Sequence, residues 1–202
     1  MQVVIIEGST RSEMGKKAAK GLRGEGLVPA IIYGGSELVN FSAPKSAFRH
    51  LIYTPDFKVA EITVEGKTYR AYVKDLQFHP VSDDLLHVDF VELVPGKTIK
   101  VEIPLRCEGN SVGVRVGGKL MQKMRKVLVK TTTEALVDHL SLDISALDLG
   151  KSLRMRDIMV NEQTTILNAP GIPVVTIEIP RALKAAQALA AKEAAGAAKK
   201  KK

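Results

Sequence analysis

The chain has a single cysteine and no long apolar run, and both scarcities exclude whole classes of structure. Cys107 stands alone among 202 residues, so it forms no internal disulfide and no cysteine-rich metal site, as fits a reducing compartment. No apolar run approaches the ~18 residues that a membrane span requires. The opening residues, MQVVIIEG, lack the basic stretch and long apolar segment of a secretory signal. We therefore expect a cytoplasmic protein with no membrane partner.

Common catalytic motifs are missing too. The sequence contains no Gly-x-Ser-x-Gly, no His-Glu-x-x-His and no P-loop. His79, His87 and Asp89 lie in one region, but their spacing matches no set of metal ligands. We expect no enzyme, no small-molecule substrate, no metal and no cofactor.

The net charge of +8 is unevenly distributed along the chain. Residues 1–93 carry 11 Lys and Arg against 12 Asp and Glu, whereas residues 94–180 and 181–202 have net charges of +3 and +6. The Ala- and Lys-rich end, 181–202, is expected to be a fraying helix followed by a flexible cationic tail. An RNA site within residues 1–93 must therefore arise from local segregation of charge.

Residues 1–93 predict a mainly β domain. β-branched residues and period-two alternation indicate strands over 2–7, 28–33, 59–64, 68–76 and 85–93. Residues 28–33 are continuously apolar, which indicates burial on both faces or a place in a barrel wall. Residues 59–64 and 68–76 flank Glu65-Gly66, which is typical of a hairpin. Gly8-Ser9-Thr10 is expected to end the first strand.

Two short helices are expected in the same region. One covers residues 15–23 and is stopped by Gly24 or Gly26. The other begins with Ser42 as its cap and Pro44 in its first turn, and its apolar stripe is formed by Phe48, Leu51 and Ile52. We expect this second helix to plug or flank the sheet.

Val94-Pro95-Gly96 breaks the pattern, and we place a domain boundary there. Residues 94–180 predict a second, β-rich domain because they are rich in Val, Thr and Gly. Its expected strands cover residues 98–105, 112–118, 126–132, 135–142, 154–160 and 173–179. Residues 143–150 are expected to form one helical turn closed by Gly150.

The most informative cations lie in the first predicted helix. Lys16, Lys20 and Arg23 are spaced i, i+4, i+7, so a helix presents all three on one face, with Ala18 and Leu22 on the other. Such a face suits a phosphate backbone, although most cationic stripes are only solvated surface.

His87 and Asp89 lie on the same face of a predicted strand, since alternate residues point the same way. The pair is compatible with a catalytic dyad, a metal site, a structural histidine whose tautomer Asp89 sets, or recognition of RNA base edges. The carboxylate favours base edges over phosphates, because it accepts from base amino groups and is repelled by phosphates. Tyr33 is able to stack or bond at the same surface.

Six ordered motifs carry a family resemblance. They are Arg11, Gly15-Lys16, Leu22-Arg23, and residues 28–35, 74–80 and 87–90. Together they resemble the bacterial large-subunit ribosomal protein L-twenty-five family. Residues 112–120 and 142–147 resemble the second domain of its long form, called the CTC or general stress type.

The resemblance implies an amino-terminal six-stranded β-barrel that binds 5S ribosomal RNA in the central protuberance of the large subunit. It implies an RNA-binding set made of Arg11, Gly15, Lys16, Lys20, Arg23, Tyr33, Gln77, His87 and Asp89. The basic members would contact phosphates and grooves, and the polar members would supply oriented hydrogen bonds. Many members have Arg where this chain has Lys20-Gly21, so a bidentate phosphate contact there becomes a point charge.

Three functions are weighed. The leading one is a structural RNA-binding protein of the large subunit, monomeric when free, with 23S rRNA or ribosomal proteins as further neighbours. The second is a stress-associated module whose carboxy-terminal domain binds a non-RNA partner, and the third is a His/Asp hydrolase. The carboxy-terminal domain is locally basic, and its cations fit either contact with neighbouring ribosomal RNA or an ordinary solvated surface. These cations are Lys119, Lys123, Arg125, Lys126 and Lys130.

Overall fold

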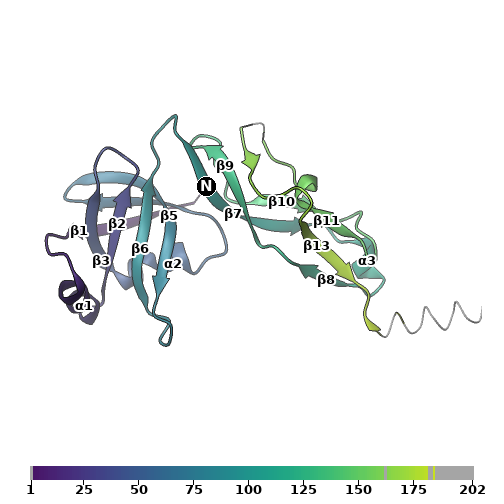
Figure 1. Ribbon diagram of the computed structural model, residues 1–202, viewed down its shortest axis with the longest axis horizontal. Coiled ribbons are helices and arrows are strands. Elements are labelled where there is room, and N and C mark those ends of the chain that lie inside the picture. The colour runs from purple at the N-terminus through teal and green to yellow at the C-terminus, as the bar shows by residue number, and fades with distance from the viewer. Residues whose placement is uncertain (1, 162, 182–183, 185–202) are drawn as a thin grey trace, which may run out of the picture. The chain divides into compact units, whose positions relative to one another are not determined.

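The computed structural model describes residues 2–161, 163–181 and 184 (Figure 1). Its described residues form two compact units. The first is drawn from Met1–Pro104, Leu128–His139 and Asn161–Thr165, and the second from Leu105–Val127, Leu140–Val160 and Ile166–Lys202. The predicted cationic tail lies outside the described residues, apart from Arg181 and Lys184. The boundary placed at 94–96 stays a prediction.

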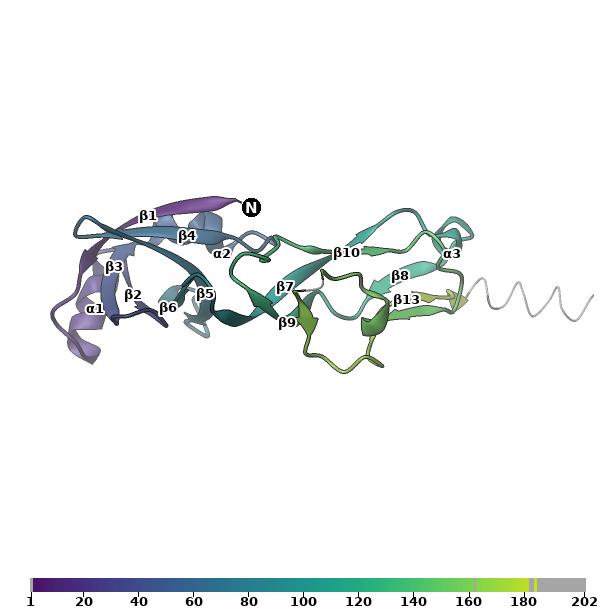
Figure 2. The ribbon, with the colours of Figure 1, turned by 90° about the horizontal axis from the view of Figure 1, so that it is seen from above.

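The first unit contains a closed six-stranded barrel in the order β1-β3-β2-β6-β5-β4 (Figures 1 and 2). Its strands are β1 Val3–Thr10, β2 Leu27–Tyr33, β3 Val39–Pro44, β4 Val59–Val64, β5 Lys67–Phe78 and β6 Leu85–Glu92. β1 pairs in parallel with β4, and β2 pairs in parallel with β6. The expected mainly β fold with an amino-terminal six-stranded barrel is confirmed.

The barrel is filled by aromatic and branched side chains. Phe41, Phe48 and Phe90 are completely buried, and the Phe90 ring centroid lies 5.9 Å from that of Phe41 and 6.2 Å from that of Phe48. Phe48 ends the 3-10 helix η1, Lys45–Phe48, which continues into α2, Arg49–Ile52. This short helical segment plugs the barrel, as its apolar stripe predicts.

The hairpin between β4 and β5 is confirmed. Glu65 and Gly66 both have positive φ, at 50° and 81°, as a two-residue turn between twisted antiparallel strands requires. The turn sets the register, in which Val64 faces Lys67 and Val59 faces Tyr72.

Two expectations about the barrel are wrong. Gly8 to Thr10 do not end the first strand, because β1 leaves β4 after Gly8 and continues as a partner of β3. Ser42 does not cap a helix. It lies in β3 opposite Pro29, and the helical segment begins at Lys45, because pairing with β2 outweighs the local capping pattern.

The remaining strands form two sheets, with the orders β10-β7-β9-β12 and β11-β13-β8. They are β7 Thr98–Glu108, β8 Lys119–Gln122, β9 Lys126–Thr132, β10 Leu140–Asp143, β11 Ser152–Arg154, β12 Thr165–Ile166 and β13 Pro173–Glu178. β7 alternates buried and exposed residues from Thr98 to Ile103, as its sequence predicts. The β-rich character of this part of the chain is therefore confirmed.

Several boundaries here were predicted incorrectly. The region 112–118 is no strand, since α3, Val112–Arg115, begins where the Ser111 hydroxyl accepts from the Val114 N–H at 3.0 Å. Strand structure at 135–142 begins only at Leu140. The strand expected over 154–160 gives way to the 3-10 helix η2, Met155–Asp157, because the Asp157 carboxylate accepts from the Arg154 N–H at 2.7 Å.

Asp143 ends β10, and residues 144–150 form turns and irregular backbone instead of the expected helical turn. The Asp143 carboxylate accepts from the Ser145 N–H at 2.8 Å, and this local bond forms a turn directly after β10. Within the part of the chain that is described, no helix is long and apolar enough to cross a membrane.

The helical plug gives a stability test. Phe48→Ala removes a completely buried ring, so the free energy of unfolding should fall by about 3–5 kcal/mol. Urea denaturation followed by circular dichroism measures the loss. Val81→Ala is the control, because Val81 is 87% exposed and its truncation should cost about 0.5 kcal/mol or less. Equal effects of the two substitutions would contradict the plug.

Candidate RNA interface

The predicted cationic helix is α1, Lys16–Gly24. Lys16, Lys20 and Arg23 are exposed, whereas Ala18 and Leu22 are half-buried, so the helix has the two faces that its sequence predicts. None of its nine residues, all of them described, is fully buried. Gly15 precedes the helix at φ 110° with open space around it, and this left-handed backbone explains glycine there.

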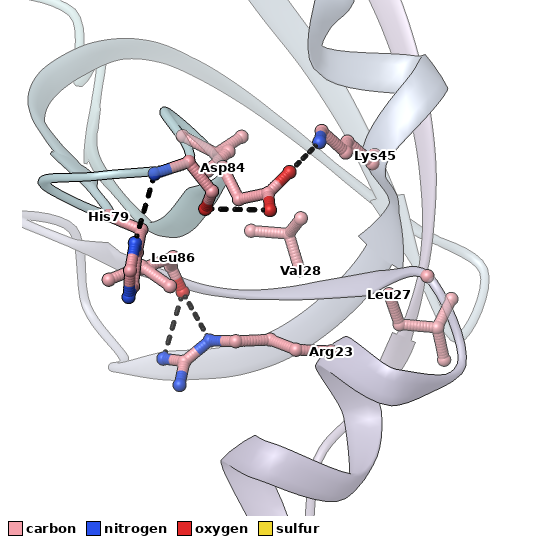
Figure 3. Close-up of a pocket in the computed structure, with 10 residues that line it drawn as sticks. Arg23, Leu27, Val28, Lys45, His79, Asp84 and Leu86 are labelled. Atoms are coloured by element: carbon pink, nitrogen blue, oxygen red, sulfur yellow. Dashed lines mark hydrogen bonds and ion pairs between the residues drawn. The ribbon is translucent and has the colours of Figure 1, made fainter.

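Arg23 joins the end of α1 to the start of β6. Its Nε and Nη2 donate to the Leu86 carbonyl oxygen at 3.1 and 3.0 Å. Figure 3 shows the guanidinium lying against this carbonyl, with its third nitrogen turned away. Arg23 therefore fixes the helix to the strand that carries His87 and Asp89, and it keeps further donors for a ligand.

His87 and Asp89 lie on the outward side of β6, while Val88 and Phe90 are buried in the barrel. The His87 Nδ1 and Asp89 Oδ1 are 2.7 Å apart, with the side chains 25% and 29% exposed. Because a carboxylate only accepts, His87 donates through Nδ1, and its Nε2 is left for another partner.

A β-bulge in β5 places Gln77 beside His87. The register shifts between Val73 and Asp75, so Lys74 is an extra residue on its strand. After the bulge, Asp75 faces Asp89, Leu76 faces the buried Val88, and Gln77 faces His87. Without the extra residue the alternation would turn Gln77 to the other face.

Tyr33 completes the same outer surface from β2, where its neighbour Ile31 faces Asp89. Partial burial raises the pKa of Tyr33, and the negative charges of Asp89 and Asp75 raise it further. Four of the predicted residues are thus brought together on the adjacent strands β2, β6 and β5. We call Tyr33, Gln77, His87 and Asp89 the polar face.

Arg11 follows β1 and belongs to neither α1 nor the polar face. Its backbone N–H donates to the Asn40 carbonyl at 3.0 Å, and its Nε donates to the Glu13 carbonyl at 2.8 Å. The structure links Arg23, but not Arg11, directly to β6 by a described hydrogen bond.

Sequence reasoning missed Asp75 as part of this surface. Strict alternation from Tyr69 through Val73 would point Asp75 inward, and only the bulge at Lys74 turns it outward beside Asp89. The available signal was the spacing of the apolar residues, since Val73 and Leu76 are three apart instead of two.

A pocket of about 320 Å³ lies between the end of α1, the start of β6 and the loop that joins β5 to β6 (Figure 3). Leu27, Val28 and Leu85 are among its apolar lining residues, and Arg23 and Lys45 are its cations. Among the described residues, no group of three or more His, Cys, Asp or Glu is placed to hold a metal ion.

Comparison with known proteins gives the family of the chain. The chain is 45% identical over 193 residues to the large ribosomal subunit protein bL25 of Cytophaga hutchinsonii, covering 96% of this chain and all of the relative. The bL25 proteins of Porphyromonas gingivalis and Amoebophilus asiaticus are each 39% identical, over 188 and 201 residues, covering 92% and 100% of this chain and 97% and 100% of those relatives. Residues 6–90 match the model of the ribosomal L25p family. The chain belongs to the ribosomal L25p family.

Residues 98–181 match a second model, the carboxy-terminal domain of ribosomal protein TL5, so the long form of the ribosomal L25p family is confirmed. The family consists of structural ribosomal proteins, and membership confirms that this protein is not an enzyme. The hydrolase hypothesis for His87 and Asp89 is therefore wrong.

The polar face gives a prediction about Tyr33. Asp89→Asn removes a negative charge that disfavours the tyrosinate, so the pKa of Tyr33 should fall toward its ordinary value. An NMR titration of the ring carbons measures this change. Glu7→Gln is the control, because Glu7 lies on β1, the strand farthest from β6 around the closed barrel. An unchanged pKa of Tyr33 in Asp89→Asn would contradict the described geometry.

Proposed function

We propose that this protein is a structural component of the bacterial large ribosomal subunit that binds 5S rRNA in the central protuberance. The binding surface is the polar face together with α1, and residues 1–93 form the RNA-binding domain. The observation that carries the proposal is the row Gln77, His87 and Asp89, which stands outward on two adjacent strands and is joined to the cationic helix through Arg23.

The helix supplies the contacts to phosphates. Lys16 and Lys20 are exposed on one face, and Arg23 keeps donors beyond those bound to Leu86. Arg11 adds a cation before the helix. Residues 1–93 have a net charge of only −1. The RNA backbone is therefore attracted by the local grouping of cations on and before α1, and not by the net charge of the domain.

The polar face supplies the directed bonds. The His87 Nε2 accepts when the ring is neutral and donates when it is protonated, while the Asp89 carboxylate accepts from base amino groups or ribose hydroxyls. Gln77 offers both a donor and an acceptor, and Tyr33 adds a hydroxyl. Such groups suit an irregular RNA helix, whose bases expose their edges more fully than those of a regular one.

The names of the relatives support a cytoplasmic location on the ribosome. The carboxy-terminal part offers the exposed cations Lys119, Lys123, Arg125, Lys126 and Lys130. We assign these cations to neighbouring 23S rRNA or ribosomal proteins. The protein needs no cofactor for this role, and it is monomeric before assembly.

Removing either half of the histidine–carboxylate pair should weaken RNA binding. For His87→Ala and Asp89→Ala we expect losses of about 1–3 kcal/mol in 5S rRNA binding, because each deletes an oriented hydrogen bond. Gel-shift titration at fixed salt measures the dissociation constants, with Glu7→Ala on β1 as the control. Wild-type affinity in both variants would contradict the polar face as the site.

Arg11 should contribute through a phosphate. Arg11→Ala should make the plot of log binding constant against log salt concentration less steep, by the amount that corresponds to about one phosphate contact. Lys67→Ala is a matched control, because Lys67 lies in the β4–β5 hairpin and its described ion pair, with Glu37, is long at 3.8 Å. An unaltered slope in Arg11→Ala would remove Arg11 from the interface.

A further inference from the structure

The loop between β5 and β6 is folded around the imidazole of His79. The backbone N–H groups of Val81 and Ser82 both donate to its Nδ1, at 3.3 and 3.2 Å. The His79 N–H donates to the Asp84 carbonyl at 2.8 Å, and the Asp83 N–H donates to the His79 carbonyl at 3.0 Å. One side chain therefore satisfies two successive backbone donors of an exposed loop.

These contacts define the state of the ring. Two N–H donors aimed at Nδ1 require a lone pair there, so the imidazole is neutral and carries its proton on Nε2. An Asn side chain at the start of a turn accepts from the same backbone donors through its Oδ1. The His Nδ1 and the Asn Oδ1 are both bonded to Cγ, so the imidazole of His79 accepts here in the way that an asparagine side chain would.

The end of this loop bonds to two other elements. The Asp84 carboxylate pairs with Lys45 of η1 and accepts from the Ser82 hydroxyl at 2.9 Å, and these bonds hold the pKa of Asp84 below its usual value. Two residues later, the Leu86 carbonyl accepts both bonds from Arg23. Figure 3 shows His79, Asp84, Leu86 and Arg23 around the same pocket.

The place of α1 depends on contacts of this kind. No side chain caps its described first turn, and none of its described residues is fully buried, so apolar packing holds it weakly. Its cations can match the spacing of RNA phosphates only if the helix keeps a fixed position relative to β6.

We propose that His79 is a positioning residue of the RNA interface. Accepting at Nδ1, it shapes the loop that presents the Leu86 carbonyl to Arg23, and it thereby fixes α1 next to His87 and Asp89. The effect on RNA affinity rests on the proposed function, whereas the effect on the loop does not.

Two substitutions in the full chain distinguish the role of the His79 Nδ1 from that of its Nε2. His79→Asn keeps an acceptor at the position of Nδ1, and His79→Gln places its polar groups nearer the position of Nε2. We expect His79→Asn to bind 5S rRNA within about twofold of wild type and His79→Gln to bind about tenfold more weakly. The Gln variant loses the two hydrogen bonds from the Val81 and Ser82 amides, so the loop no longer holds the Leu86 carbonyl in place for Arg23. The salt slope should stay unchanged in His79→Asn, because α1 keeps its place and a neutral ring that faces its own loop pairs with no phosphate.

Amide hydrogen exchange of Val81 and Ser82 in the RNA-free protein gives a second measurement. Protection of both amides should persist in His79→Asn and fall in His79→Gln, and an NMR spectrum of the wild-type imidazole should show the proton on Nε2. Thermal unfolding of each variant checks that the barrel is intact.

Several results would overturn the proposal. Binding retained by His79→Gln but lost by His79→Asn would make His79 a direct RNA contact through Nε2. A salt slope lowered by about one in His79→Asn, with the Val81 and Ser82 amides still protected, would make His79 a phosphate contact. Equal affinity of both variants to wild type would show that the loop does not position α1. If wild type fails to bind 5S rRNA, the proposed function fails, and the amide measurements still decide whether His79 holds the loop.

Discussion

Closure of the barrel depends on β1, which pairs with β4 along its first part and with β3 along its last. β1 runs parallel to β4 from Val3 to Gly8 and then pairs with β3 at Ser9 and Thr10. A Cβ at Gly8 would lie 2.5 Å from the buried Phe41 ring, so the close packing of Phe41 against β1 favours glycine there. Closure leaves the described barrel strands without a free edge and holds each of them in register.

That register determines how the polar face is presented. Along β6, the buried Val88 and Phe90 alternate with His87 and Asp89, so the packing that anchors two side chains in the core also aims the other two outward. The parallel contact with β2 and the antiparallel contact with β5 bring polar groups to both sides of β6. A rigid strand is thus the support for the directed bonds that we propose for RNA.

The cationic helix is attached by a different kind of interaction. α1 is exposed along most of its length, and Arg23 ties its end to the Leu86 carbonyl by polar bonds. The positive charges therefore stand on an element held by a few hydrogen bonds, whereas the carboxylates of Asp75 and Asp89 stand on the barrel. This separation of charge is the basis for assigning phosphates to the helix and base edges to the strands.

Several elements of the fold and of the candidate site depend only on residues that are close in sequence, so the amino-acid sequence by itself determined them. Helix α1, the Glu65-Gly66 hairpin and the shared face of His87 and Asp89 all follow from spacing, and the ordered motifs indicated the family. Tertiary structure alone decided that Ser42 belongs to a strand, since its partner Pro29 is distant in sequence. It also decided that Lys74 bulges, because Leu76 then packs inward against β6 and Gln77 comes to lie beside His87. Local patterns record the preferences of single segments, and the pairing of distant segments selects among them.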